Sequence, residues 1–301
     1  MDELDIRILK ELGSPASPQW NVRESYASIG RKLGVDEETV RKRVRRAMEL
    51  GSFPPWLMKP NPRLIGCQAA VLDVEVEDEG GKAEALSKIR ALEGVVTILD
   101  FQGRGLMVVL YYRDEGSLNG LAARIGSACG SQTWAMWKQD FPNPEIRMKK
   151  IDWEIIHTMA DDARMDLQEV AGKTGATVRT VQRRLAEMIA ERAIYLSGRP
   201  YYDAITGQAY HFVVSCPDEG KKRAADKLVL SKVDRMERFD TSSKQYSVFV
   251  VHCENPAEAS RTLGWLKGLD GVESARMSVI NEAFHVQDWL KVEIEKKRAT
   301  A

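Results

Sequence analysis

The sequence predicts an α+β fold in which two winged-helix-like helix-turn-helix units alternate with two ferredoxin-like βαββαβ domains. The first observation behind this prediction is an internal repeat. Residues 33–44 align with residues 174–185 at a constant offset of 141, and Gly66 and Gly207 follow at the same offset. The second observation is that, in each copy, apolar residues recur first at helical spacing and then in alternating strands. The chain therefore reads as a tandem duplication.

The opening helix of each copy is predicted by an apolar stripe at intervals of four residues. The stripe consists of Leu4, Ile8 and Leu12 in the first copy and of Ile151, Ile155 and Met159 in the second. The openings align at an offset of 147 instead of 141, so the first copy holds six extra residues near positions 14–25. This insertion is rich in proline and serine, which predicts a loop.

A turn and a third helix follow in both copies. Gly34 and Gly175 fall where a tight turn between two helices needs positive φ. The helix after each glycine carries one apolar stripe, formed by Val40, Val44 and Met48 in the first copy and by Val181, Leu185 and Met188 in the second. We expect the remaining faces of both helices to be exposed to water.

The rest of each copy has the element order βαββαβ. In the first copy we expect strands at 69–76, 95–101, 106–112 and 132–138, with helices at 82–92 and 118–125. In the second copy we expect strands at 210–215, 233–239, 246–252 and 272–280, with helices at 220–230 and 257–266. A last helix, at about 281–297, has no counterpart in the first copy.

These elements predict five segments. They are helix-turn-helix domains at 1–58 and 146–198, ferredoxin-like domains at 64–141 and 207–281, and a C-terminal helix and tail at 282–301.

Composition limits the class of protein. The chain has 44 basic and 44 acidic residues, and each predicted domain is also near neutrality, so a nucleic-acid footprint must come from local clustering. No apolar run reaches the roughly 20 residues of a membrane span. The four cysteines form no CxxC pair, which argues against a disulfide framework or a zinc finger. We expect a cytoplasmic protein.

The repeated pattern resembles the leucine-responsive and asparagine-regulator (Lrp/AsnC) family of bacterial and archaeal transcription factors. The residues that carry the resemblance are Leu4–Leu9, Ile29–Val44 and Leu64–Gly66 in the first copy, and Ile151–Ile156, Val170–Leu185 and Ile205–Gly207 in the second. The resemblance implies double-stranded DNA as partner, dimerisation through the sheets and a small-molecule effector at the ferredoxin-like domains. The family's Gly-x-Tyr-Asp effector signature is missing, because this chain has Gly103–Leu106 and Lys244–Ser247 there.

The third helix of each copy is the predicted recognition helix. The predicted DNA-contacting residues are Glu38, Arg41, Lys42, Arg43, Arg45 and Arg46 in the first copy, and Arg179, Gln182, Arg183 and Arg184 in the second. Arginine and lysine pair with guanine in the major groove or neutralise phosphates. The second set is less basic, and Ala186 and Glu187 replace Arg45 and Arg46. We therefore expect an asymmetric DNA site, with most of the electrostatic attraction to DNA coming from the recognition helix of the first copy.

Nothing in the sequence argues for catalysis on its own, so we expect no enzyme, no cofactor and no metal. One metal or redox alternative rests on His211 and His252, with Cys216 and Cys253 at the ends of the same strands. These are the first and third strands of the second sheet, which we expect to be parallel neighbours.

Two other classes of function remain open. Siroheme decarboxylases resemble this chain in architecture and are built from paired halves. They carry His-Asn-Tyr-x-Arg and Asn-x-Trp-Phe stretches, where this chain reads Thr97–Gln102 and Arg238–Thr241. The other class is an effector-sensing or assembly module, in which the C-terminal helix caps the fold or pairs with another chain. A homodimer is compatible with each of these functions, and no membrane partner is expected.

Overall fold

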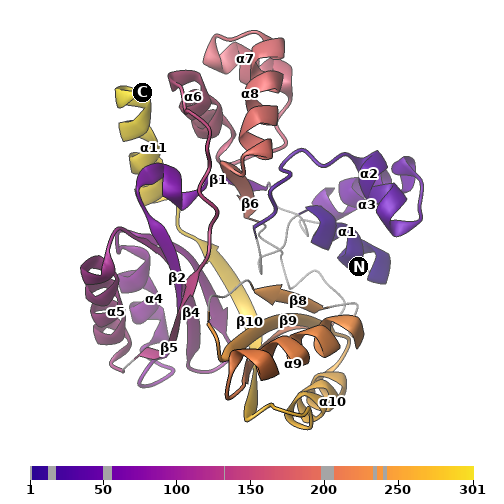
Figure 1. The fold of residues 1–301 in the computed structure, drawn as a ribbon, viewed down its shortest axis with the longest axis vertical. Coiled ribbons are helices and arrows are strands. Elements are labelled where there is room, and N and C mark those ends of the chain that lie inside the picture. Colours follow the sequence, from indigo (N-terminus) through magenta and orange to yellow (C-terminus); the bar gives the residue numbers. More distant parts are fainter. Residues whose placement is uncertain are drawn as a thin grey trace. The chain divides into compact units, whose positions relative to one another are not determined.

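The fold is described from a computed structural model. It describes residues 2–12, 18–49, 56–131, 133–197, 207–232, 236–239 and 243–301. The chain forms two compact units, and each unit contains parts of both copies (Figure 1). The sheet unit comprises residues 1–2, 69–140 and 201–284, and the helical unit comprises residues 3–68, 141–200 and 285–301. Parts of the predicted elements at 14–17, 53–55, 205–206, 233–235 and 240–241 lie outside the described residues.

The helical unit contains both predicted three-helix groups. Their helices are α1 (Glu3–Leu12), α2 (Tyr26–Leu33) and α3 (Glu37–Glu49) in the first copy, and α6 (Lys150–Met159), α7 (Leu167–Thr174) and α8 (Val178–Ala190) in the second. The turn glycines have the expected backbone, since φ is 72° at Gly34 and 67° at Gly175. Only a residue without a Cβ adopts this region at little cost.

A short antiparallel ribbon joins the two copies within the helical unit. Strand β1 (Leu57–Pro60) of the first copy pairs with β6 (Ile194–Ser197) of the second, with Met58 opposite Leu196. The 3₁₀ helix η1 (Pro62–Ile65) follows β1 and ends at Gly66, whose φ is 72°. The ribbon is therefore shared between the copies, and neither copy completes it alone.

The sheet unit is one eight-stranded sheet built from two ferredoxin-like halves. The first half comprises β2 (Gln68–Glu75), α4 (Lys82–Arg90), β3 (Val95–Phe101), β4 (Gly105–Tyr112), α5 (Glu115–Cys129) and β5 (Thr133–Gln139). The second comprises β7 (Gln208–Ser215), α9 (Glu219–Lys232), β8 (Met236–Phe239), β9 (Tyr246–Cys253), α10 (Pro256–Lys267) and β10 (Ser274–His285). The strand order is β5-β2-β4-β3-β10-β7-β9-β8. Each half thus has the ferredoxin-like order, with its fourth strand next to its first, and the predicted fold class is confirmed.

The sheet curls strongly instead of lying flat. Arg276 on β10 forms an ion pair with Asp73 on β2, although β4 and β3 lie between these strands in the sheet order. In a flat sheet that separation would be roughly 14 Å, beyond the reach of an arginine side chain. The ring of Phe101 on β3 also stacks on His211 of β7, with centroids 4.8 Å apart. The faces of the two halves that carry no helices therefore approach each other.

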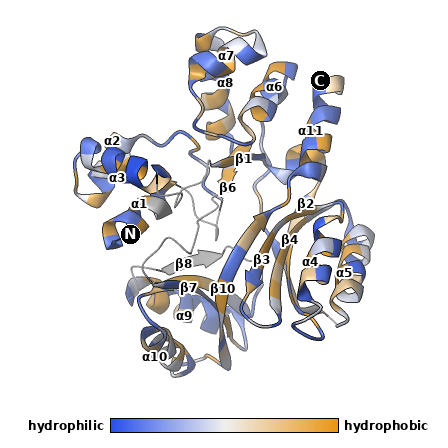
Figure 2. Cartoon of the chain, turned by 180° about the vertical axis from the view of Figure 1, so that it is seen from behind, coloured by the Kyte–Doolittle hydropathy of each residue, from blue (hydrophilic) through white to orange (hydrophobic). Residues whose placement is uncertain are grey.

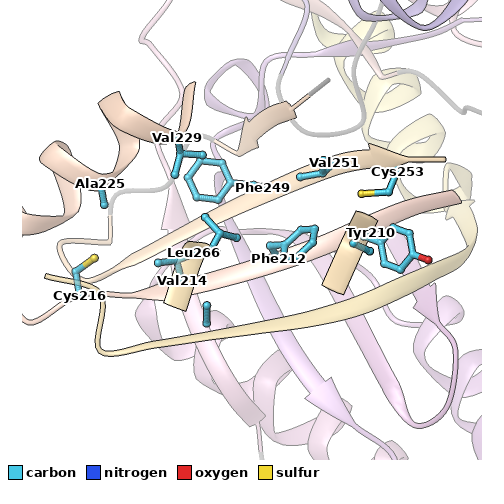
Figure 3. Close-up of a cluster of buried hydrophobic side chains, with 12 residues drawn as sticks. Tyr210, Phe212, Val214, Cys216, Ala225, Val229, Phe249, Val251, Cys253 and Leu266 are labelled. Carbon is cyan, nitrogen blue, oxygen red and sulfur yellow. The ribbon is translucent and has the colours of Figure 1, made fainter. Parts of the chain in front are cut away.

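The helix-covered face of the second half holds an apolar core (Figure 3). Its buried side chains come from alternate positions along β7 and β9, from both helices, from the residue after β7 and from β10: Tyr210, Phe212, Val214, Cys216, Ala225, Val229, Phe249, Val251, Cys253, Ala259, Leu266 and Ala275. In Figure 2 the strands of the sheet carry much of the hydrophobic colour. Both cysteines are packing residues of this core.

The two histidines that were considered with these cysteines lie on the other face. His211 pairs across the strands with Val250, and His252 with Ala209, so both alternate with the core positions. Strands β7 and β9 run antiparallel, so the expected parallel arrangement is wrong. The reason is that βαββαβ connectivity reverses the third strand relative to the first. Among the described residues no group of three or more histidine, cysteine or carboxylate side chains could hold a metal ion.

The C-terminal helix begins later than predicted. Residues 281–285 continue strand β10, and α11 spans Asp288–Thr300. The strand continues because it changes neighbours, from β7 along its first part to β3, where the Gln102 N–H donates to the Val279 carbonyl at 2.9 Å. Within the helical unit, α11 packs on α6, and Arg298 binds Glu154 at 2.6 Å. The helix caps the second copy's helical group.

Candidate nucleic-acid interface

Helix α3 of the first copy is positioned by capping and by a hydrophobic stripe. Asp36 lies just before the helix, and its carboxylate accepts hydrogen bonds from the backbone N–H and the hydroxyl of Thr39, each at 2.8 Å. These hydrogen bonds lower the pKa of Asp36. Val40 and Val44 are buried, as the sequence predicts, whereas Met48, the third residue of the predicted stripe, is 48% exposed. The stripe fixes which face of α3 remains in water, and Figure 2 shows the helix as largely hydrophilic in colour.

The exposed face of α3 carries fewer unpaired cations than its sequence indicates. Arg41 forms an ion pair with Glu37 and a second, at 3.5 Å, with Glu38. Lys42 lies 3.9 Å from Glu38. Residues Arg45 and Arg46 are exposed, and neither has a side-chain partner among the residues that the structure describes. The cations most available to a phosphate backbone are therefore the two in the last turns of the helix.

Two of the predicted DNA-contacting arginines point inward. Arg43 donates to Asp5 of α1 at 2.9 Å, with about a third of its side chain exposed. Arg184 is buried, and its guanidinium binds Asp152 of α6 through two nitrogens, with Nε at 2.5 Å from Oδ1. These pairs occupy equivalent positions in the two copies. They hold the first helix against the third, and the guanidinium of Arg184 is not available to DNA.

The sequence held a signal for these ion pairs. Each opening helix has an aspartate at its Leu-Asp or Ile-Asp position, and each third helix has an arginine at the same repeat position, directly before the second valine or leucine of the stripe. An aspartate and an arginine retained together in both copies indicate an internal pair.

The exposed face of α8 carries fewer charged side chains than the exposed face of α3. Arg179 and Gln182 are exposed, and Arg183 is exposed but bound to Glu187 at 2.9 Å. Thr177 caps the helix by accepting from the Thr180 N–H at 3.2 Å. Within the described part of the chain, helix α8 therefore presents one exposed arginine without a side-chain partner and one amide, where α3 presents two such arginines.

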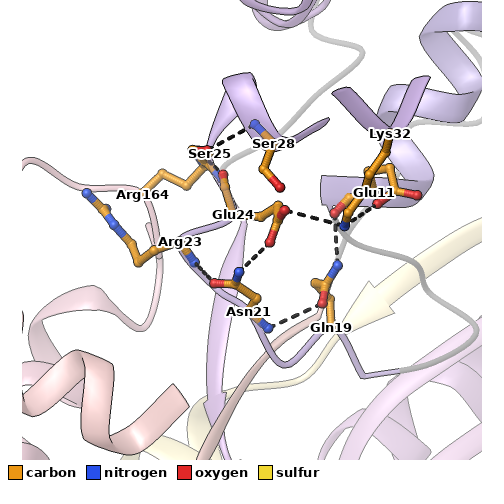
Figure 4. Close-up of polar contacts among 9 residues, drawn as sticks. All are labelled: Glu11, Gln19, Asn21, Arg23, Glu24, Ser25, Ser28, Lys32 and Arg164. Atoms are coloured by element: carbon orange, nitrogen blue, oxygen red, sulfur yellow. Dashed lines mark hydrogen bonds and ion pairs between the residues drawn. The ribbon is translucent and has the colours of Figure 1, made fainter. Parts of the chain in front are cut away.

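The extra segment of the first copy is anchored by a polar network (Figure 4). Lys32 on α2 lies 2.9 Å from Glu11 and 3.3 Å from Glu24. Gln19 donates to the Glu11 carbonyl at 2.9 Å. Burial raises the pKa of Glu24, but a hydrogen bond from Ser28 and the charge of Lys32 outweigh it, so the pKa is lowered. Trp20 packs on Phe141 and Tyr195, each at 5.9 Å between centroids, so this residue serves packing.

Comparison with known protein families places two DNA-binding modules on these helices. An AsnC-type helix-turn-helix domain matches residues 1–48. A winged helix-turn-helix DNA-binding domain matches residues 148–194. The predicted resemblance to the Lrp/AsnC family is confirmed by the AsnC-type domain of the first copy, and the second copy matches a winged helix-turn-helix DNA-binding domain.

Curated relatives carry the same kind of name. The chain is 32% identical over 104 residues to the HTH-type transcriptional regulator Ptr1 of Methanocaldococcus jannaschii, a match that covers 34% of this chain and 66% of that protein. The chain spans between 63% and 66% of the length of the curated relatives it matches.

The fold of the whole chain is also that of an enzyme. The siroheme decarboxylase NirDL matches with a TM-score of 0.57 at 12% identity, covering 99% of both chains. Its complex with an iron-uroporphyrin III analogue matches with a TM-score of 0.56 at 13% identity, covering 98% of this chain and all of that one. The expectation that the chain is no enzyme is therefore overturned. It rested on missing sequence motifs, whereas the full-length architecture supports catalysis in another protein.

The helices of the described residues include none that is both long and apolar enough to cross a membrane.

Proposed function

We propose that this chain is a sequence-specific DNA-binding transcriptional regulator whose recognition helices are α3 and α8. The observation that carries the proposal is the pair of helix-turn-helix units, each with a glycine turn, a buried stripe and an exposed polar face. Recognition helices of this type enter the major groove, where arginine pairs with guanine and amide side chains pair with adenine. Such a regulator acts where the chromosome is, which is the cytoplasm of a bacterial or archaeal cell.

The two helices read different sequences in this proposal. On α3 the residues that face DNA are Glu38, Arg41, Lys42, Arg45 and Arg46, and on α8 they are Arg179, Gln182 and Arg183. Arg43 contributes to the position of α3, and Arg184 to that of α8. The proposal thus narrows the predicted contact set to the side chains that are exposed on each helix.

Selection on random duplexes tests this proposal. We expect an asymmetric site whose two halves respond to different mutations, with Glu38→Ala relaxing selection in one half and Gln182→Ala in the other. Gln182→Ala should cost about 1–3 kcal/mol of discrimination at one base pair. A perfect palindrome protected equally on both arms by one chain would contradict the asymmetric reading.

A second candidate function is a reaction on a tetrapyrrole carboxylate, as in siroheme decarboxylase. The observation that favours it is the match to NirDL along the whole chain. The curled sheet also holds the buried polar residues Asp73 and His211, and Asp73 pairs with the partly exposed Arg276. Mixing the purified protein with siroheme tests this candidate, since binding shifts the tetrapyrrole absorbance and turnover releases carbon dioxide. An unchanged spectrum would remove it.

An effector and a homodimer are further parts of the proposal. The sheet unit is where an effector would bind, and equilibrium dialysis against amino acids checks this. Sedimentation checks the oligomeric state. A chain with two recognition helices already provides the pair that family members obtain by dimerisation, so DNA binding by the monomer is expected.

A further inference from the structure

Two arginines, one in each helical group, donate hydrogen bonds to backbone carbonyls of the other group. Arg23 of the first copy donates from Nη1 to the Met165 carbonyl at 3.1 Å and to the Ala163 carbonyl at 3.4 Å. Arg164 of the second copy donates from Nη2 to the Glu24 carbonyl at 3.0 Å. The two arginines occupy equivalent repeat positions 141 residues apart, and so do the carbonyls of Glu24 and Met165. Each copy therefore holds the start of the other copy's second helix by the same contact.

Aromatic rings of the first copy add to the contact of Arg164. Its guanidinium lies over the Tyr26 ring at 4.9 Å and over the Trp56 ring at 5.6 Å. The Tyr26 ring also contacts Arg41 of the recognition helix α3, at 5.7 Å. Cation–π contacts of this kind are individually modest and strengthen when water is excluded. Tyr26 thus links the second copy's arginine to the helix that is proposed to read DNA.

Two backbone hydrogen bonds also join the copies reciprocally. The Met58 N–H of β1 donates to the Ala160 carbonyl at 3.0 Å, and the Leu196 N–H of β6 donates to the Gln19 carbonyl at 2.8 Å. Gln19 and Ala160 are again 141 residues apart, and Met58 faces Leu196 in the ribbon. The two helical groups are thus related by a local pseudo-twofold axis that passes through the ribbon.

The positive charges of Arg23 and Arg164 lie close enough to repel each other, so neighbouring groups must offset this repulsion. Burial and then the charge of Arg164 lower the pKa of Arg23, whereas Asp162, Asp166 and Tyr26 raise it. Two guanidinium groups that repel each other are held together here by carbonyls, carboxylates and aromatic rings. A chance contact between loops would not place the same arginine–carbonyl contact in both copies.

We infer that Arg23 and Arg164 are positioning residues that clasp the two helix-turn-helix groups and thereby fix the spacing between the two DNA half-sites. The inference rests on the proposed DNA-binding function for its consequence, but the clasp itself is a property of the free protein. A rigid pair of recognition helices tolerates only one separation and one rotational phase of the half-sites along DNA. Loss of the clasp leaves the two groups joined through the β1–β6 ribbon but free to change their relative orientation, so that they accept several spacings.

The clasp is tested first without DNA. Spin labels at Arg31→Cys and Gly172→Cys occupy equivalent, exposed positions on α2 and α7, and the four native cysteines are buried. A Cβ at position 172 meets open space. We expect a narrow distance distribution in the parent and a broad one in the Arg23→Ala/Arg164→Ala variant. Arg7→Ala, which removes an exposed arginine of α1, is the matched control and should leave the distribution narrow.

Spacing is then tested on the selected DNA site. Inserting about 5 bp between the half-sites rotates one by about half a helical turn. We expect the parent and the Arg7→Ala control to lose at least about tenfold in affinity, and the clasp variant to lose less than about threefold. Circular dichroism of the variant shows whether its helices remain folded.

The outcomes separate the two proposals. An equally narrow distance distribution in the clasp variant overturns the clasp, whether or not DNA binds. A broad distribution in that variant, together with no DNA binding by the parent, keeps the clasp and overturns the proposed function and the spacing role. Equal sensitivity of the parent and the clasp variant to the 5-bp insertion also overturns the spacing role.

Discussion

Arg43 and Arg184 occupy the same position in the two recognition helices, and each binds the aspartate of its own first helix. Their basic character suggested DNA contact, because a sequence shows charge but not the direction of a side chain. On a helix of 3.6 residues per turn, they lie at the edge of the buried stripe, where either direction is open. The tertiary partner on the first helix decides the direction, and spacing within the third helix does not reveal it.

The difference in burial between these two pairs predicts different stability losses. Arg184→Ala leaves the fully buried Asp152 without its partner and should lower the free energy of unfolding by about 3–5 kcal/mol. Arg43→Ala breaks a partly exposed pair and should cost about 1 kcal/mol or less. Urea unfolding followed by circular dichroism measures both. Equal losses in the two variants would contradict the structural role of the buried pair.

Acid sensitivity of the sheet unit should depend on His211. Burial, and then the charge of Arg276, lowers the pKa of His211 to about 3 in the folded protein, compared with about 6.5 when unfolded. The unfolded state therefore takes up the proton first, and stability is lost as pH falls below 6.5. This loss is about 1.4 kcal/mol per pH unit for one histidine. Unfolding at pH 7 and pH 5.5 should show a smaller loss in His211→Gln than in the parent; identical losses would show that His211 does not contribute.

At the scale of elements, the periodicity of apolar residues predicted the helices and strands. The residues at which they end depended on the neighbouring elements in the fold. The helices between Gly34 and Glu49 and between Gly175 and Ala190 were predictable from a turn glycine and one apolar stripe. The start of α11 was not, because residues 281–285 continue strand β10, which pairs with β3 of the other copy. Such a long-range partner leaves no local signal in the sequence.

Helix α11 should stabilise the second helical group through its buried face. Ile294 is 1% exposed and Val292, on the same helix, is 51% exposed. Ile294→Ala should therefore cost about 2–4 kcal/mol and Val292→Ala less than about 0.5 kcal/mol. Thermal unfolding of the two variants checks this. If Val292→Ala were the more damaging change, α11 would have to pack through its other face.

At the scale of the whole molecule, duplication was visible in the sequence but its consequence was not. An offset of 141 residues predicts two similar halves, yet it does not say that the linker strands pair with each other or that β3 joins β10. The two halves also take different places in the sheet, since the first contributes its second strand to the joint and the second its fourth. Equivalent sequences thus became non-equivalent elements.

The same asymmetry holds for the proposed interface. Only the first recognition helix has two exposed arginines without side-chain partners among the described residues, whereas the helical group of the second is capped by α11, which packs on α6. The recognition helix of the first copy is therefore expected to provide most of the positive charge that attracts DNA. The helical group of the second copy is expected to be the more rigid of the two. The clasp of Arg23 and Arg164 connects the two roles.

The central claim is that the chain binds duplex DNA with most of its electrostatic grip in α3, and salt titration tests it most directly. Each lost phosphate contact should lower the slope of log affinity against log salt by about 0.9. We predict that Arg45→Ala/Arg46→Ala lowers this slope by about 2, and that Arg179→Ala/Arg183→Ala lowers it by about 1 or less. No measurable salt dependence in the parent, or an equal reduction by the two double variants, would contradict the claim.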